Sequence, residues 1–185
     1  LEFRRVLFRS DDEQGYLMLP DKARRFREIL DLVLDKSGNR MVYVTRGKQL
    51  APEEHASEVD ESELYSVYVD GLLREQTVGQ PIDIQFSPNG DDVVYQMCEA
   101  PSKEERECFV VNAGQRSMAY PSAVGSPFKD IAISPDGKRV AFVLEDDESD
   151  AMMLVLDDVV VAQYDNVSSP AFSPRGELAY GARDG

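Results

Sequence analysis

Short alternating segments of apolar and polar residues run along the chain, and a recurring turn sequence separates them. The turn occurs in "FSPNGDDVVY" at 86–95, "ISPDGKRVAF" at 133–142, "FSPRGELAY" at 172–180 and, in weaker form, "LDKSGNRMVY" at 34–43. Serine, proline, aspartate and glycine are favoured at successive positions of a tight turn, and β-prone residues flank each copy. Each copy therefore predicts a β-hairpin.

A second hairpin is predicted after each first one. Strand, polar turn and strand follow one another in segments 65–78, 108–124 and 152–167, and more weakly in 16–29. Two hairpins in roughly 45 residues give four strands per repeat, which is the sequence signature of a β-propeller blade.

These turns and their flanking strands resemble the WD40-like β-propeller repeats of bacterial proteins, such as the propeller of the periplasmic Tol-system protein. The resemblance covers most of residues 11–185 and is strongest at 82–98 and 129–145. The chain has no tryptophan and no Gly-His pair, so it departs from the eukaryotic WD-repeat subfamily. The resemblance implies an all-β fold. The expected architecture is a partial β-propeller, in which four-stranded antiparallel blades, about four blades' worth, form an open array.

The repeats also imply a division of the chain. We expect an outer hairpin at 11–28, whole blades at 29–79, 80–127 and 128–167, and the inner hairpin of a further blade at 168–185.

The segment 21–38 has an alternative interpretation as an amphipathic helix. Its apolar residues lie at helical spacing, and Gly38 follows them as a stop signal. Alignment with the other copies instead places Leu30, Leu32 and Leu34 on a strand equivalent to 82–86. We favour the strand.

Residues 1–10, "LEFRRVLFRS", match the translation of a common sequencing-library adapter. They have neither the apolar core of a secretory signal nor the length and serine content of a transit peptide. We therefore expect them to be non-native, with no fixed role or paired to an open sheet edge. The chain would then be a piece of a longer ring, whose missing blades would be partners of its exposed sheet faces.

The overall charge narrows the classes of partner. The formal net charge is −15, and it becomes −17 without the first ten residues, which carry three arginines and one glutamate. A surface this acidic repels phosphate backbones and anionic lipids. No apolar run approaches the ~18 residues of a membrane-spanning helix. We therefore expect no nucleic-acid partner and no membrane insertion.

Residue types that carry catalysis are scarce. The single histidine, His55, lies in the polar stretch 51–62, where a solvated loop residue is more plausible than a catalytic base. The acidic run 145–150 lacks the periodic spacing of a calcium loop. No glycine-rich phosphate loop and no Cys/His cluster of zinc spacing occurs. We predict no catalytic residue, no metal site and no cofactor.

The two cysteines flank one polar loop. If the strands beside this loop pair as a hairpin, Cys98 faces Cys108 and Met97 faces Phe109. Directly opposed strand residues are close enough for a disulfide, although two free thiols at the base of a loop remain the alternative. A disulfide would imply an oxidising compartment, so the localisation, otherwise unknown, leans towards periplasmic or secreted.

An aspartate column precedes the turns. Asp31, Asp83 and Asp130 each lie seven residues before a turn glycine, and Ser169 takes the fourth position. In a propeller, equivalent positions form a ring about the axis, so the carboxylates could surround one mouth of the channel and bind a cation or a basic peptide. The alternative, which we favour, is that each aspartate accepts backbone N–H groups where the chain enters a new blade.

These patterns favour a non-catalytic scaffold that binds a protein or peptide partner through its loops. An alternative is the gating propeller of a prolyl-oligopeptidase-like serine peptidase whose hydrolase domain is missing. A propeller enzyme with its catalytic residues on missing blades is a third possibility, and fold alone does not choose among the three.

Overall fold

The computed structural model describes residues 8–11, 14–18, 23–49, 64–99, 106–122, 127–145 and 151–185. Within these ranges the chain forms strands and turns and no helix, so the predicted all-β class is confirmed. The chain divides into two compact units, Leu1–Gln85 and Phe86–Gly185.

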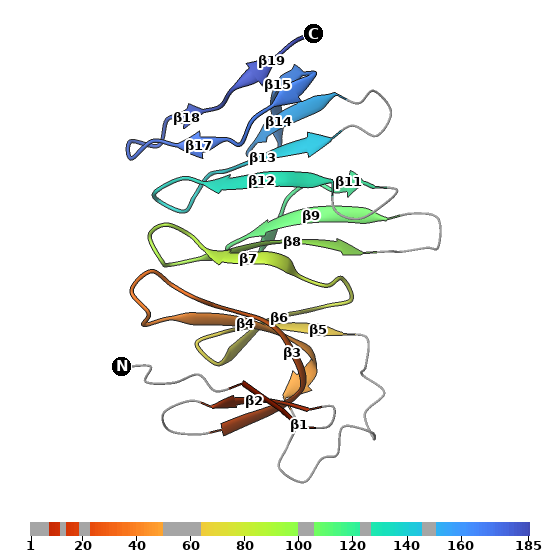
Figure 1. The fold of residues 1–185 in the computed structure, drawn as a ribbon, viewed down its shortest axis with the longest axis vertical. Helices are drawn as coiled ribbons and strands as arrows, with labels where there is room; N and C mark the ends of the chain where they lie inside the picture. The colour runs from red at the N-terminus through yellow and green to blue at the C-terminus, as the bar shows by residue number, and fades with distance from the viewer. Residues whose placement is uncertain are drawn as a thin grey trace. The chain divides into compact units, whose positions relative to one another are not determined.

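The first unit holds a six-stranded sheet in which strands adjacent in sequence are adjacent in space (Figure 1). All of its neighbouring strands pair antiparallel. The strands are β1 (Phe8–Asp11), β2 (Gln14–Met18), β3 (Ala23–Leu34), β4 (Met41–Gln49), β5 (Tyr65–Val69) and β6 (Leu72–Thr77). Strand β1 forms one edge of this sheet, so the last residues of the decapeptide pair with a neighbouring strand.

Strand β3 decides between the two interpretations of segment 21–38. It is a single strand of 12 residues, so the strand prediction is confirmed and the helix is wrong. Leu32 faces Tyr43 and Leu34 faces Met41 across the β3–β4 ladder, which gives the apolar residues of β3 partners at strand spacing. The strand also runs across the boundary expected after residue 28.

An aromatic cluster forms the core of the first unit. Tyr43 and Tyr68 face each other on β4 and β5, and their rings stack with centroids 5.0 Å apart. The Phe26 ring meets them edge-on, at 5.5 Å from Tyr43 and 5.4 Å from Tyr68. Met41 completes this buried cluster. Edge-on and offset aromatic pairs add about 0.5–1.5 kcal/mol to the effect of area burial, so this cluster fixes the register of β3, β4 and β5.

The second unit contains two larger antiparallel sheets and two short pairs (Figure 1). The second sheet has the order β10-β9-β8-β7, with β11 also paired to β9, and the third has the order β12-β13-β14-β15. The strands of the second sheet are β7 (Ile82–Phe86), which begins at the end of the first unit, β8 (Val93–Glu99), β9 (Glu107–Asn112), β10 (Gln115–Arg116) and β11 (Tyr120–Pro121). The third sheet consists of β12 (Phe128–Ile133), β13 (Val140–Glu145), β14 (Met152–Leu156) and β15 (Val159–Tyr164). The short pairs join β16 (Asn166–Val167) to β19 (Ala182–Arg183) and β17 (Ala171–Phe172) to β18 (Leu178–Ala179).

Strand β13 is buried on both of its faces. On one face Val140, Phe142 and Leu144 pack against residues of the second sheet, in a core that includes Val110. On the other face Val143 packs in a second cluster towards the C-terminal segment. Full burial of one such side chain contributes about 1.5–3 kcal/mol. Through the buried side chains of its first face, β13 joins the second and third sheets.

The recurring turn has the same geometry in each copy. The amide of the turn glycine donates to the carbonyl oxygen of the first turn residue, at 2.8 Å for Ser87 and at 2.9 Å for Ser134, Ser173 and Asp35. The side chain of the first residue accepts a second amide from across the turn, as when Arg139 N donates to Ser134 Oγ at 2.9 Å. The side chain thus closes the turn that the proline and glycine begin.

Asp35 explains why the first copy of the turn can depart from the common sequence. Its carboxylate accepts the Ser37 hydroxyl at 2.5 Å and the Asn39 and Arg40 amides at 2.8 Å. These hydrogen bonds, led by that of Ser37, lower the pKa of Asp35 to about 2. An aspartate carboxylate here takes the role that the serine hydroxyl has in the other copies.

A second repeated device is an aspartate that holds the start of the strand preceding its own hairpin in the same sheet. Asp70, between β5 and β6, accepts Arg40 Nε at 2.9 Å and the Met41 amide at 2.9 Å. Asp157, between β14 and β15, accepts Arg139 Nε at 2.9 Å and the following backbone amide at 3.0 Å. Both aspartates have a left-handed φ, 51° and 50°, which aspartate tolerates better than most residues. We call this arrangement the aspartate clamp.

The second sheet lacks the clamp. Ala113, with φ of 52°, stands where the other sheets have the clamp aspartate, and Asp92 stands where they have the arginine. The backbone bond survives, because Ala113 N donates to the Val93 carbonyl oxygen at 3.2 Å.

Candidate functional site

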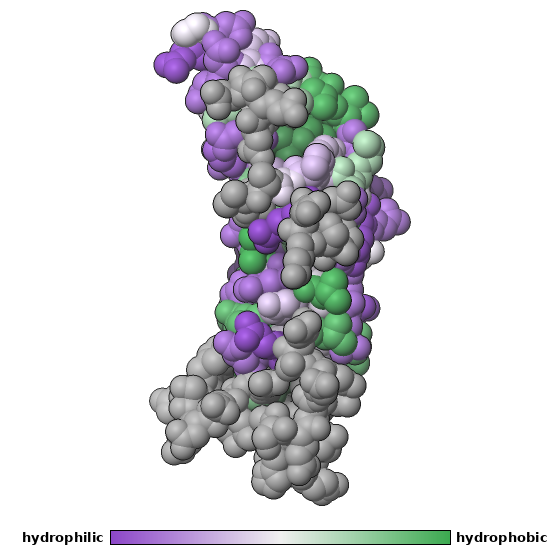
Figure 2. Space-filling view, turned by 90° about the vertical axis from the view of Figure 1, so that its right-hand side faces the viewer, coloured by the Kyte–Doolittle hydropathy of each residue, from purple (hydrophilic) through white to green (hydrophobic). Residues whose placement is uncertain are grey.

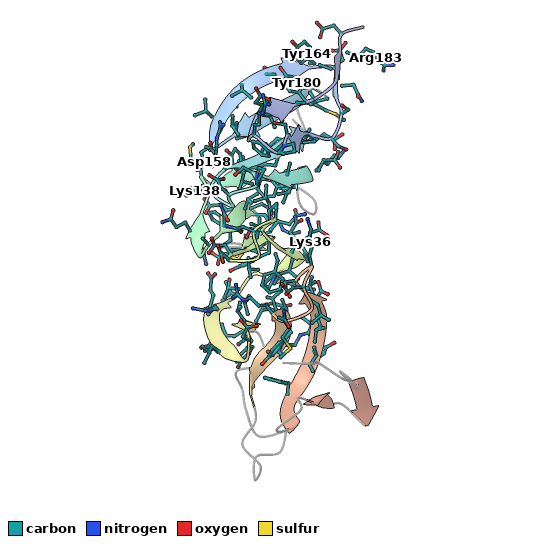
Figure 3. The ribbon with its side chains drawn as sticks, turned by 90° about the vertical axis from the view of Figure 1, so that its left-hand side faces the viewer. Lys36, Lys138, Asp158, Tyr164, Tyr180 and Arg183 are labelled. Carbon is teal, nitrogen blue, oxygen red and sulfur yellow. A yellow bond between two sulfur atoms is a disulfide. The ribbon has the colours of Figure 1, made fainter. Side chains whose placement is uncertain are left out.

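An open pocket of ≈ 190 Å³ lies within the second unit, between the second and third sheets. The turns at its rim connect β9 to β10, β12 to β13 and β14 to β15. Figure 3 labels two of the residues that line it, Lys138 and Asp158. The lining consists of Val110, Asn112, Gln115, Arg116, Ser117, Lys138, Val140, Phe142, Asp157 and Asp158.

The floor of the pocket is apolar and rigidly supported. Val110, Val140 and Phe142 are buried members of the core between the two sheets. The Phe142 ring also meets Tyr120 and Phe128 edge-on, with centroids 5.6 Å and 5.1 Å away. A floor held by three interlocked rings keeps its shape when a ligand enters.

Most charged groups of the pocket have internal partners. Arg116 Nη2 lies 3.0 Å from Glu99 Oε1. Asp157 belongs to the aspartate clamp and has both oxygens engaged. Asp158 Oδ1 accepts the Met118 amide at 3.1 Å.

Asp158 also accepts a hydrogen bond from the Tyr120 hydroxyl. Burial, followed by the charge of Asp158 and this hydrogen bond, raises the pKa of Tyr120 to about 12. Tyr120 therefore remains a neutral donor that holds the Asp158 carboxylate at the rim of the pocket.

One polar atom of the pocket lacks a hydrogen-bond partner in the described part of the chain. Asn112 Nδ2 donates to the Gly137 carbonyl oxygen at 3.1 Å, but the buried Asn112 Oδ1 accepts no hydrogen bond there. The Lys138 ammonium interacts with a neighbouring carboxylate, because the Ser134 hydrogen bond and, to a smaller extent, the charge of Lys138 lower the pKa of Asp136. A buried acceptor without a donor costs about 1–3 kcal/mol.

The aspartate column is described only in its local surroundings. Asp31 Oδ1 accepts the Leu32 amide within its own strand at 2.7 Å. Asp83 and Asp130 are exposed and have left-handed φ values of 52° and 53°. Ser169 is exposed. The ring of carboxylates stays a prediction, and so does the alternative of bonds to the backbone of a neighbouring blade.

The two cysteines face each other as the hairpin register predicts. Cys98 pairs with Cys108, Met97 with Phe109 and Tyr95 with Val111, so this register is confirmed. The cysteines form a disulfide with their Cα atoms 4.0 Å apart. Cys108 is fully buried in the core between the second and third sheets, and Cys98 packs against that core.

Other sequence candidates fall outside this site. His55 and residues 146–150 lie beyond the described residues. Glu145, the first residue of the acidic run, forms an ion pair with Lys129. No group of three or more His, Cys, Asp or Glu side chains in the described ranges could hold a metal ion. In those ranges no helix is long and apolar enough to cross a membrane.

The sequence interpretation missed every polar residue of the pocket. Asn112, Lys138 and Asp158 stand at the ends of three different hairpin turns, far apart in the sequence. One signal was present, because the repeat alignment places these turns at the same end of successive hairpins. Side chains beside them were therefore candidates for one shared site.

Comparisons with known proteins do not assign a family. No family model matches the chain, and no curated protein matches it. Among solved structures, the hydrazine synthase of Kuenenia stuttgartiensis is similar at 11% identity and a TM-score of 0.37, over 92% of this chain and 68% of that one. A proposed 6-phosphogluconolactonase of Bacteroides fragilis is similar at 13% identity and a TM-score of 0.30, over 93% of this chain and 49% of that one. The chain thus spans about half of the latter protein, and neither likeness supports a functional assignment.

Proposed function

We propose that the successive sheets are blades of a β-propeller and that the chain is a rigid, non-catalytic scaffold that binds a protein or peptide partner. The observation that carries this proposal is the hydrogen bonding between turns of the second and third sheets. Asn89 Nδ2 donates to the Asp136 carbonyl oxygen at 3.0 Å, and Asn112 Nδ2 donates to the Gly137 carbonyl oxygen at 3.1 Å. Blades that repeat side by side place their turns together in this way, and turns on a rigid framework form a binding surface.

The surface of the second unit supports binding of an extended partner. Figure 2 shows apolar surface towards the C-terminal part of the chain. The outer strand β15 exposes Val159, Val160 and Val161 at 61%, 50% and 46%. Most outer strands carry charges that prevent pairing with other chains, whereas these valines leave the edge accessible.

A random-peptide display selection on the immobilised chain tests the proposal. Each enriched peptide is then synthesised and measured by calorimetry against the folded chain and against heat-denatured chain. We expect at least one sequence family that binds only the folded protein, with a dissociation constant of about 100 µM or lower. An empty selection would contradict the scaffold role, and turnover of a peptide library would contradict the non-catalytic assignment.

A further inference from the structure

The sequence contains one Asn-Gly pair, Asn89–Gly90, in the turn between β7 and β8. Glycine has no Cβ, so its amide nitrogen can approach the preceding side chain closely, and this makes the pair prone to deamidation. The Gly90 nitrogen attacks Asn89 Cγ, the Cγ–Nδ2 bond breaks, and Nδ2 leaves as ammonia with the Gly90 amide proton. Water then opens the cyclic imide and leaves aspartate or isoaspartate at position 89. Asn89 is exposed, so water has access to this site.

The folded turn engages the groups that this reaction needs. The Gly90 amide donates to the Ser87 carbonyl oxygen at 2.8 Å. Asn89 Oδ1 accepts the Ser87 hydroxyl at 2.5 Å and the Asp91 amide at 3.2 Å. Asn89 Nδ2 donates to Asp91 Oδ2 at 3.1 Å and to the Asp136 carbonyl oxygen at 3.0 Å. The side chain must release several of these bonds before Cγ can turn towards the Gly90 nitrogen, so the folded turn slows deamidation.

Part of this restraint comes from the third sheet. Asp136 lies in the copy of the recurring turn between β12 and β13, and both turns belong to the second unit (Figure 1). The neighbouring Gly137 also confines the asparagine, because a Cβ at Gly137 would lie 3.1 Å from Asn89 Oδ1 and 3.2 Å from Asn89 Nδ2. Packing of the second sheet on the third therefore adds to the protection that the turn gives by itself.

Deamidation to aspartate would spare the turn and remove the contact. In the third sheet Asp136 stands at the position of Asn89, and its Oδ1 accepts the Ser134 hydroxyl at 2.6 Å and the Lys138 amide at 3.2 Å. These are the same two bonds that Asn89 Oδ1 accepts, so an aspartate at position 89 keeps them. It loses the N–H donor, and a carboxylate oxygen would instead face the Asp136 carbonyl oxygen and the Asp91 carboxylate.

We propose that Asn89 is a deamidation site that the third sheet protects, and that its reaction removes the hydrogen bond between the second and third sheets. The modification needs only water, and it is irreversible, so it weakens this contact permanently once the turn has opened. The proposal concerns a covalent change of the chain and does not depend on the proposed peptide binding.

An Arg175→Asn variant compares two identical turns in one molecule. The change converts the Ser-Pro-Arg-Gly of the last turn into the Ser-Pro-Asn-Gly found at 87–90. The Gly176 amide donates to the Ser173 carbonyl oxygen at 2.9 Å, as Gly90 does to Ser87, but a Cβ at Gly176 would have no described atom within 4 Å. The two sites therefore differ in whether a neighbouring sheet covers the turn.

Peptide mapping by mass spectrometry follows both sites while the variant is kept at neutral pH and physiological temperature. In the folded protein we expect Asn89 to react roughly fivefold more slowly than the introduced asparagine, which is the factor that one net hydrogen bond gives. In urea the two sites should react at similar rates, since both turns are then open. Arg175 is exposed, so this variant is expected to fold as the wild type does.

Three substitutions examine the role of the third sheet. Gly137→Ala places a methyl group against the Asn89 amide and should speed deamidation of Asn89 severalfold, whereas Gly176→Ala has a left-handed φ without neighbours and should leave this rate unchanged. Leu154→Val is the control for stability, because Leu154 lies in the buried cluster on the other face of β13. It should speed the reaction less than Gly137→Ala does.

The reaction product is tested by Asn89→Asp. This variant should lower the Tm of the chain by roughly 2–4 °C, because the hydrogen bond to the third sheet is lost.

Slower reaction of Asn89 than of the introduced asparagine, acceleration by Gly137→Ala alone and a lower Tm for Asn89→Asp support the inference. Equal rates at the two sites in the folded protein, equal acceleration by Leu154→Val and Gly137→Ala, or an unchanged Tm of Asn89→Asp would overturn it. If Gly137→Ala does not fold, the Arg175→Asn comparison decides the question of protection. The display selection tests peptide binding separately, so the two proposals fail separately.

Discussion

Replacing the aspartate of a clamp by alanine should destabilise its sheet by a predictable amount. Asp70 accepts two hydrogen bonds, from Arg40 Nε and the Met41 amide, each at 2.9 Å, and it does so at a left-handed φ of 51°. Asp70→Ala removes both bonds and leaves a residue that tolerates this conformation poorly. Asp70→Gly removes the bonds but relieves the conformation, and Asp70→Asn keeps a neutral acceptor for the amide.

The magnitude follows from the exposure of each group. The side chains of Arg40 and Asp70 are 29% and 39% exposed, so solvent screening limits their ion pair to about 0–1 kcal/mol. The bond to the partly buried Met41 amide contributes about 1–1.5 kcal/mol. A left-handed alanine costs a further ~1 kcal/mol. We therefore expect the loss to be about 2.5 kcal/mol for alanine, about 1.5 kcal/mol for glycine and below about 1 kcal/mol for asparagine.

Thermal unfolding followed by near-ultraviolet circular dichroism measures this series. The chain has no tryptophan, and the stacked pair of Tyr43 and Tyr68 gives the first unit its own aromatic signal. At about 2–4 °C per kcal/mol, Asp70→Ala should lower the Tm of this signal by roughly 5–10 °C. Equal losses for alanine and glycine would show that the backbone conformation contributes nothing, and a loss for asparagine as large as for alanine would refute the role of the amide bond. The Asp157 series in the second unit is an independent replicate.

Three further predictions concern the turns and the disulfide. In urea unfolding, Gly137→Ala should lower the free energy of unfolding by about 1 kcal/mol more than Gly176→Ala. Both glycines have a left-handed φ, but of the two only Gly137 would place a Cβ close to other atoms, the nearest at 3.1 Å. Equal losses of stability would refute this crowding. Replacing Cys98 and Cys108 together by alanine should cost about 2–3 kcal/mol, as expected for a short closed loop, and mass spectrometry after alkylation without reductant should find no free thiol in the wild-type chain. The pKa of Asp35 is lowered to about 2 from an ordinary 3.8, so its carboxylate stabilises the fold fully above about pH 4, and this contribution is lost as the pH falls towards 2. The difference in stability between the wild type and Asp35→Asn should therefore shrink as the pH falls through that window. A difference that does not change with pH would contradict this prediction.

Pairing between strands that are close in sequence was predictable in detail. The register of β8 and β9, including the opposition of Cys98 and Cys108, follows from counting outwards from one loop, since side-chain alternation leaves little freedom in a hairpin. The strand at 23–34 required comparison with the other copies, because its own apolar spacing also suits a helix. Phe26 and the two stacked tyrosines decide the matter by offering a buried surface to a strand.

The polar residues of the pocket and the clamps were not predictable from local pattern. Nothing in "VDG" or "LDD" shows that the aspartate reaches the arginine beside the preceding strand, since that contact depends on the β4–β5 and β13–β14 registers. In the same way, Asn112 and Lys138 are ordinary turn residues until the second and third sheets pack together. Sequence repetition identified the positions that are equivalent, but not the ones that touch.

The amino-acid sequence by itself determined the all-β class, the hairpins, their turns and the opposition of the two cysteines. These features depend on φ preferences, alternation and loop length, which act over a few residues. Only the tertiary structure decided which turns share a pocket, which carboxylates are neutralised and which acceptor is left without a donor. Those properties arise when sheets pack face to face, because burial and hydrogen bonding are set by neighbours that are distant in the chain.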